Sequence, residues 1–118
     1  QTTQKPQSFG EIAGYIASQA KELLAYNTIC NATHDRQNAA HLIAPEVDAM
    51  IVVGGRDSAN TNRLSEICSG AGVPTYHIET SDEIDPSWFV NAETVGLTAG
   101  ASTPDWIIES VKNALEAL

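Results

Sequence analysis

The stretch 49–60, AMIVVGGRDSAN, decides the fold class, because a continuous apolar run from Ala49 to Val53 ends in a polar loop that contains glycine. Such runs are typical of buried parallel strands, and Ser and Asn in the loop favour a helix start. The same order occurs in 27–33, NTICNAT, and in 95–102, VGLTAGAS. Since the carboxyl ends of parallel strands share one edge, where ligands usually bind, we expect all three loops to face one cleft.

The spacing of apolar residues predicts helices and strands in alternation along the chain. We expect helices at about 8–25, 33–43 and 60–70, a final helix from near Pro104, and strands at 28–29, 49–53, 75–78 and 94–97. Ser8 and Glu11 have the spacing of a capping box for the first helix, and a short helical turn is expected after Pro86.

This alternation predicts an α/β fold, a three-layer sandwich around a mostly parallel sheet of about four strands. The helix expected near the N-terminus has no strand before it in this chain.

Composition excludes several classes of protein. The 118 residues carry a formal net charge of −9, with 6 Lys and Arg against 15 Asp and Glu, which argues against a nucleic-acid binder. No apolar stretch has membrane-spanning length, so we expect no membrane partner. The two cysteines, Cys30 and Cys68, are too few for a disulfide framework, and a reducing cytoplasm is the expected compartment.

Two of the three loops have the character of anion-binding turns. Gly54 and Gly55 let the backbone approach a ligand, and Ser58 and Asn60 follow at the start of the next helix. Ser102 lies in the corresponding position after the last strand. The alternative interpretation is that these hydroxyls are simply N-caps of the helices that follow.

The cysteines have different surroundings. Cys30 lies at a strand-to-helix junction, where a helix N-terminus favours a thiolate that binds metal or attacks an electrophile; the alternative is a small buried hydrophobic residue. Cys68 lies within a helical stretch and is expected to be structural. The histidines form no metal-ligand spacing with one another or with either cysteine, and the acidic residues show no acid/base pair.

These three loops carry a resemblance to a known family. The motifs 28–33 (TICNAT), 53–64 (VGGRDSANTNRL) and 98–104 (TAGASTP) resemble those of 4-hydroxy-3-methylbut-2-enyl diphosphate reductase, the last enzyme of the methylerythritol phosphate route to isoprenoids. The similarity runs in order through the whole chain, from Gln1 to the C-terminus.

The resemblance implies an oxidoreductase with a 4Fe-4S cluster held between three similar lobes, one cysteine from each. Such an enzyme removes the hydroxyl of an allylic diphosphate as water, giving isopentenyl and dimethylallyl diphosphate, with electrons from a donor such as ferredoxin or flavodoxin. It works in the cytoplasm, or in the plastid stroma of a plant-type source.

The resemblance also implies roles for particular residues. Cys30 matches a cluster ligand, and Thr2 matches a catalytic threonine near the substrate hydroxyl. The residues that match substrate-binding positions are Ser58, Asn60, Ser102 and Thr33. Cys68 matches no ligand.

The chain departs from the family pattern in two respects. Ala59 replaces a serine that is common beside the phosphate loop, and the lobes that would carry the other cluster cysteines, the histidines that bind diphosphate and a proton-relaying glutamate are missing. The resemblance therefore implies that residues 27–118 form the C-terminal α/β lobe of a longer reductase and that residues 1–26 form an additional N-terminal helix that leads in from the preceding lobe. We expect this fragment to be inactive alone and unable to hold the cluster stably. Two alternatives remain open: a stand-alone, non-catalytic phosphate-binding α/β module, and a thiol enzyme that uses Cys30, for which no nearby base is evident.

Overall fold

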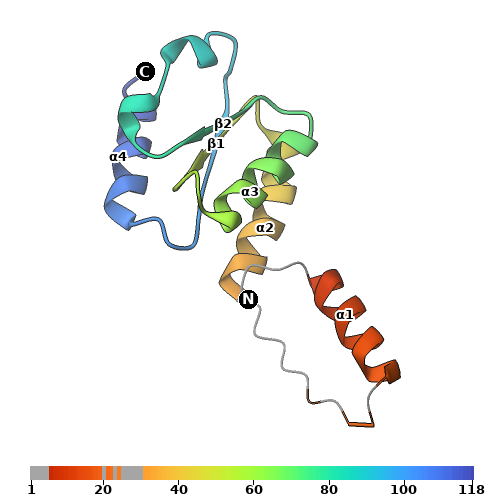
Figure 1. Ribbon diagram of the computed structural model, residues 1–118. Helices are drawn as coiled ribbons and strands as arrows, with labels where there is room; N and C mark the ends of the chain where they lie inside the picture. The colour runs from red at the N-terminus through yellow and green to blue at the C-terminus, as the bar shows by residue number, and fades with distance from the viewer. Residues whose placement is uncertain (1–5, 20, 23, 25–30) are drawn as a thin grey trace.

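The computed structural model describes residues 6–19, 21–22, 24 and 31–118. Three parallel strands form the sheet, in the order β2-β1-β3. The helices and strands, in chain order, are α1 (Pro6–Gln19), α2 (Asn31–Ile43), η1 (Ala44–Glu46), β1 (Ala49–Val53), α3 (Ala59–Gly70), β2 (Thr75–Ile78), η2 (Ser81–Glu83), η3 (Pro86–Phe89), β3 (Val95–Ala99) and α4 (Asp105–Glu116). Helix α1 lies apart from the sheet (Figure 1).

The central strand β1 is buried along its whole length, as its unbroken apolar sequence predicts. Its neighbours pair with it in register, Val52 with His77 of β2 and Val53 with Ala99 of β3. Alternate side chains of β1 point to opposite faces, so each face receives part of the same apolar run.

Helices cover both faces of the sheet and produce the three layers (Figure 1). On one face, Met50 and Val52 pack with Leu64 and Cys68 of α3 and with Ala40 of α2. On the other face, α4 and the η2–η3 connection cover the sheet. There the buried residues Ile51, Val53, Ile78, Ala99 and Val111 form a second cluster, flanked by a stacked pair of rings, Tyr76 and Trp88, with centroids 4.2 Å apart.

The α/β class is confirmed, and strands 49–53 and 75–78 have the expected bounds. The expected number of about four strands is corrected to three in the part of the chain that the structure describes; the remaining expected strand, 28–29, lies outside that part. The first helix begins at Pro6 and ends at Gln19 rather than spanning 8–25, so Ser8 lies within the helix and does not cap it.

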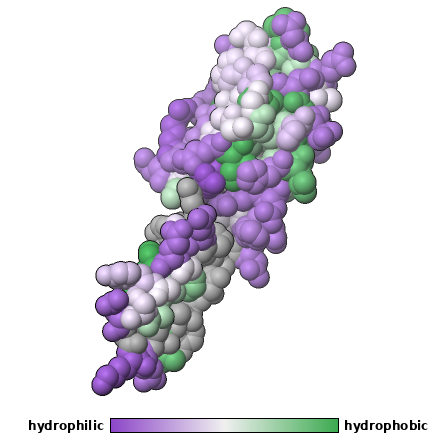
Figure 2. All heavy atoms as spheres, turned by 90° about the vertical axis from the view of Figure 1, so that its right-hand side faces the viewer, coloured by the Kyte–Doolittle hydropathy of each residue, from purple (hydrophilic) through white to green (hydrophobic). Residues whose placement is uncertain are grey.

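None of the described helices is both long enough and apolar enough to cross a bilayer. Figure 2 shows polar side chains over much of the sheet-bearing part, with smaller apolar areas between them. On α1, Ile12 and Tyr15 are exposed.

The carboxylate of Asp48, just before β1, joins the amino ends of β1 and β3 by hydrogen bonds. Asp48 Oδ2 accepts hydrogen bonds from Glu93 N, Thr94 N and Thr94 Oγ1, each 2.9 Å long. The backbone hydrogen bond from Thr94, followed by that of its hydroxyl and then that from Glu93, holds the pKa of Asp48 below its ordinary value. The ionised carboxylate is therefore the form that stabilises this end of the sheet.

Replacing Asp48 by Asn should loosen the start of β3 at neutral pH. Because the pKa of Asp48 is lower in the folded than in the unfolded state, its carboxylate contributes fully to the free energy of unfolding above the unfolded-state pKa, about 3.9. That contribution is lost as the pH falls through the lower pKa of the folded state. We therefore expect faster amide hydrogen exchange at Glu93 and Thr94 and a lower unfolding temperature at neutral pH in Asp48→Asn. Both differences should vanish in acid.

The matched control is Asp82→Asn, which removes the same charge from an exposed position on η2. A destabilisation of Asp48→Asn that persisted unchanged in acid would show that the carboxylate charge is not its cause.

Candidate functional site at the carboxyl edge of the sheet

Two loops meet at the carboxyl edge of the sheet. The β1 loop (residues 54–58) leads into α3, and the β3 loop (residues 100–104) leads into α4 (Figure 1). Val53 O accepts hydrogen bonds from Gly100 N at 2.9 Å and from Thr103 Oγ1 at 3.0 Å. The loops that carry Ser58 and Ser102 therefore lie side by side, at the edge where ligands of parallel sheets usually bind.

Two glycines allow the loops to approach this closely. Gly54 has a φ of +148°, which side chains rarely permit, and a Cβ there would lie 2.7 Å from Thr61 Oγ1 and 2.8 Å from Thr103 Oγ1. A Cβ on Gly100 would collide with the same Thr61 hydroxyl. Thr61, from the first turn of α3, thus lies against both loops.

The N-cap interpretation holds for one serine and not for the other. Ser58 is the N-cap of α3, and its Oγ accepts a hydrogen bond from Thr61 N at 3.3 Å. Helix α4 has Pro104 at its N-cap and no side-chain cap, so neither Ser102 nor Thr103 caps it. Ser102 is exposed in the β3 loop, and Thr103 is engaged with β1.

The site contains buried polar atoms without partners. Asn60 is only 5% exposed, and within the described part of the chain neither its Oδ1 nor its Nδ2 has a hydrogen-bond partner. Thr61 Oγ1 is likewise buried and unpartnered there. Leaving such a group unpaired costs about 1–3 kcal/mol, so the buried amide of Asn60 has hydrogen-bonding capacity to offer a ligand or a water molecule at this edge.

Segments that follow β2 hold the β1 loop from its other side. His77 Nε2 lies 2.8 Å from Gly54 O, and Arg56 N donates to Glu79 Oε1 at 2.7 Å. The guanidinium of Arg56 forms an ion pair with Glu83. The cationic side chain of the loop therefore points to a carboxylate of this chain.

Backbone N–H groups fix Glu83 as an anion. Its Oε1 accepts hydrogen bonds from Glu79 N at 2.7 Å and from Thr80 N at 3.2 Å. The hydrogen bond from Glu79 is the largest of the effects that hold the pKa of Glu83 below its ordinary value, against a smaller opposing effect of burial. Glu83 consequently remains ionised and available to Arg56 at neutral pH.

The structure describes only some of the other residues expected at the site. Thr33 is buried in the first turn of α2. Thr2 and Cys30 lie outside the described residues, so their expected roles stay predictions. Cys68 is fully buried in the apolar cluster beneath α3, and burial raises the pKa of its thiol, as suits a structural residue.

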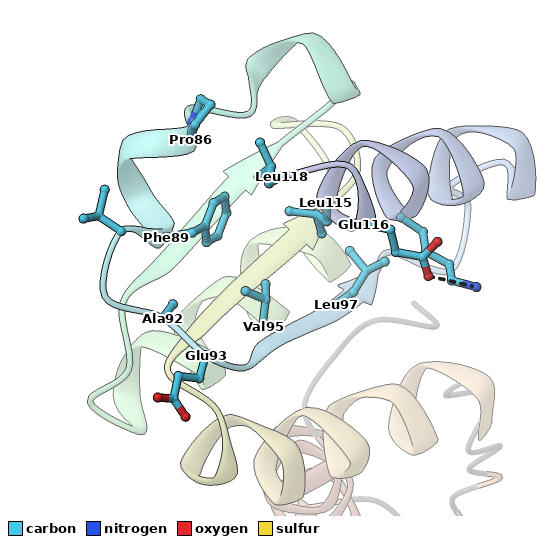
Figure 3. Close-up of a pocket in the computed structure, with 11 residues that line it drawn as sticks. Pro86, Phe89, Ala92, Glu93, Val95, Leu97, Leu115, Glu116 and Leu118 are labelled. Atoms are coloured by element: carbon cyan, nitrogen blue, oxygen red, sulfur yellow. Dashed lines mark ion pairs between the residues drawn. The ribbon is translucent and has the colours of Figure 1, made fainter.

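A different concavity lies on the α4 face of the sheet. This groove of about 620 Å³ has mainly apolar lining residues, among them Phe89, Val95, Leu97 and Leu115, whose side chains gather around it in Figure 3. Two of its charged lining residues, Lys112 and Glu116, form an ion pair with each other. Unlike the carboxyl edge, the groove presents no buried polar atom that lacks a partner.

The carboxyl edge presents several kinds of hydrogen-bond donor. It offers loop hydroxyls, an amide side chain and N–H groups at two helix starts, a set that suits an anion. In the described part of the chain, no three residues among His, Cys, Asp and Glu come close enough to hold a metal ion.

Three further residues shape this site. Thr103 is expected from sequence only as an alternative N-cap to Ser102, and Thr61 only as part of the 53–64 motif, so local sequence does not predict their contacts with the glycines. His77 was expected only as a strand residue. Its contact with Gly54 depends on the pairing of β2 with β1, which local sequence does not specify.

Comparison with known proteins assigns the chain to a family. Residues 1–116 match the family model described as "LytB protein". The curated relatives include 4-hydroxy-3-methylbut-2-enyl diphosphate reductase of Aquifex aeolicus (strain VF5), 51% identical over 118 residues, and that of Trichlorobacter lovleyi, 52% identical over 116 residues. These alignments cover 100% and 98% of this chain but 41% of either relative, so the chain spans about two fifths of their length.

Solved structures agree with this assignment. A structure of (E)-4-hydroxy-3-methyl-but-2-enyl diphosphate reductase, 51% identical, superposes with a TM-score of 0.81 over 100% of this chain and 42% of its own. The E-1-hydroxy-2-methyl-but-2-enyl-4-diphosphate reductase from Plasmodium falciparum, 29% identical, superposes with a TM-score of 0.78 over 98% of this chain and 37% of its own.

Adding a methyl group at Gly100 should separate the two loops. The new Cβ of Gly100→Ala would overlap Thr61 Oγ1, which is buried and has no room to withdraw, so we expect a loss of about 1–3 kcal/mol in the free energy of unfolding. Adding Thr61→Ala should recover part of that loss, because it removes the overlapping hydroxyl. Denaturant unfolding of the four proteins of this cycle measures the coupling.

Gly70→Ala provides the control, since a Cβ there meets no atom within 4 Å. Additive effects of Gly100→Ala and Thr61→Ala would contradict the contact.

Proposed function

The chain belongs to the LytB protein family, and from this premise we propose that it is the C-terminal lobe of a 4-hydroxy-3-methylbut-2-enyl diphosphate reductase. Its β1 and β3 loops then bind the diphosphate group of the allylic substrate. The observation that carries this proposal is the buried amide of Asn60, which lies in the first turn of α3 and has neither of its polar atoms paired among the described residues.

The groups at the carboxyl edge of the sheet suit a diphosphate although the chain has a net negative charge. Neutral donors and helix N-termini stabilise an anion at short range without a basic surface. Such donors come from Ser58 in the β1 loop, Asn60 in the first turn of α3 and Ser102 in the β3 loop. Thr33 lies at the start of a third helix. Asn60 donates through Nδ2, while its Oδ1 accepts from a protonated ligand oxygen or from water.

Ser58 combines capping with binding in this proposal. Its Oγ accepts the hydrogen bond from Thr61 N, which leaves the hydroxyl proton free to be donated to a phosphate oxygen. The cap and the ligand contact therefore use different parts of the same group and do not compete. Ala59, which replaces a serine common in the family, provides no hydroxyl of its own.

The 4Fe-4S cluster of the family is not accommodated by the described residues alone. Cys68 is enclosed by apolar side chains, its thiolate is disfavoured by burial, and no metal-binding group of three residues is present in that part of the chain. Cys30, which lies outside it, is the proposed ligand from this lobe, and other lobes supply the remaining ligands. Thr2 near the substrate hydroxyl, and a donor such as ferredoxin or flavodoxin, belong to the same proposal.

Replacing Asn60 by Ala in the complete reductase should weaken diphosphate binding. Loss of a hydrogen bond to a charged group corresponds to about 1.5–3 kcal/mol, or roughly ten- to 150-fold in the dissociation constant. Calorimetric titration with inorganic diphosphate, and the Michaelis constant for the allylic diphosphate, measure the effect. Asn91→Ala, at an exposed position beyond the opposite end of β3, is the control and should bind like the parent.

Unchanged affinity in a folded Asn60→Ala protein would count against the proposed role. Diphosphate binding without any reductive activity in the intact parent protein would favour the non-catalytic phosphate-binding module instead.

The two cysteines should behave differently when removed from the complete enzyme. Cys68→Ala should leave the iron content per protein unchanged, because Cys68 is packed in the core, whereas Cys30→Ala should lower it. Iron analysis and visible absorption after anaerobic purification distinguish the two variants. Loss of iron from a folded Cys68→Ala protein would require a new assignment of the cluster ligands.

A further inference from the structure

The β1 loop contains a peptide group whose direction is set from outside the loop. Gly54 N donates to Ile78 O at 3.0 Å, and Gly54 O lies 2.8 Å from His77 Nε2. A carbonyl oxygen can only accept, so His77 Nε2 must carry the proton of this hydrogen bond. Both backbone groups of Gly54 consequently face β2.

The next backbone donor must therefore face the opposite way. In a trans peptide the C=O and the following N–H point in opposite directions, so Gly55 N–H points away from β2. Strand β3 lies on that side of β1, as Val53 O shows by accepting from Gly100 N. Gly55 N–H is thus directed toward the β3 loop, which carries Ser102.

The peptide after Gly55 is held from the β2 side as well. Arg56 N donates to Glu79 Oε1 at 2.7 Å, and the Arg56 side chain pairs with Glu83. Within the described residues, Gly55 N–H donates to no backbone or side-chain acceptor, although the N–H groups of both its neighbours do. Gly55 is exposed, and a Cβ there would meet only Glu79 Oε1, at 3.8 Å.

We propose that Gly55 N–H donates to the anionic ligand and that His77 and Glu79 are positioning residues that hold this donor in place. This inference rests on the proposed diphosphate function and names further residues of that site. His77 anchors the peptide before Gly55 and Glu79 the peptide after it, so the donor between them cannot rotate. Without His77, the Gly54–Gly55 peptide is free to flip, which would turn its carbonyl oxygen toward the phosphate and repel it.

The test compares His77→Leu with His77→Gln in the complete reductase. Gln retains an N–H donor that reaches Gly54 O, whereas Leu removes it. We expect His77→Leu to raise both the dissociation constant of inorganic diphosphate and the KM of the allylic substrate about three- to tenfold, with kcat nearly unchanged. The kcat should change little because His77 is expected to affect the binding of the diphosphate and not the bond that reacts. His77→Gln should recover most of the affinity.

Three further variants make the outcome decisive. His41→Leu, at an exposed position on α2, controls for the loss of a histidine and should match the parent. Glu79→Ala and Glu79→Gln repeat the comparison at the second anchor, since Gln keeps an acceptor for Arg56 N. This pair decides the question if His77→Leu fails to fold.

The results distinguish the positioning role of His77 and Glu79 from the proposal that the two loops bind diphosphate. If Asn60→Ala weakens diphosphate binding while His77→Leu and Glu79→Ala do not, the positioning role is overturned. Equal losses in His77→Leu and His77→Gln, or a loss confined to kcat, would overturn it too. Unchanged affinity in Asn60→Ala would overturn the diphosphate assignment itself and this inference with it.

Discussion

At the carboxyl end of β1, Val53 O accepts hydrogen bonds from Gly100 N and Thr103 Oγ1, and this attachment determines where both loops lie. The β3 loop is bound to the central strand there, so it cannot move independently of the β1 loop. Thr61 then fills the space between Gly54 and Gly100. Because no side chain fits at either glycine, the distance between the loops is set by packing as well as by hydrogen bonds.

Much of the fold could be predicted from local sequence because its strongest elements are strongly patterned. The apolar run of β1 is buried on both faces, and its bounds follow directly from its composition. Helix α1 was harder, because it packs on little of the described chain and its apolar residues Ile12 and Tyr15 are exposed. The spacing of its apolar residues therefore predicts a helix but not its ends, and the helix begins at Pro6, a residue suited to the first turn.

The candidate site was predictable only as a set of loops on one edge. That Ser58, Asn60 and Ser102 lie at the same edge of the sheet follows from the parallel direction of the strands, whereas the adjacency of β1 and β3 is set by the strand order of the sheet. The anchors His77 and Glu79 could not be predicted, because their contacts join residues 23 positions apart in sequence and depend on the register of β2 against β1. The burial of the Asn60 amide, without a hydrogen-bond partner among the described residues, is likewise a property of packing, since an Asn at a helix start ordinarily reaches solvent or the backbone.

The pairing of Arg56 with Glu83 has a consequence for how a ligand arrives. With its loop cation neutralised and a formal charge of −9, this chain contributes a repulsive field toward any anion at a distance. Attraction begins only where the ligand touches the oriented dipoles of the loops. Dissolved salt screens the repulsion beyond about 10 Å but hardly affects those short contacts. The contribution of this chain to the association rate of an anion should therefore become more favourable as ionic strength rises. A site built on exposed lysines and arginines shows the reverse dependence.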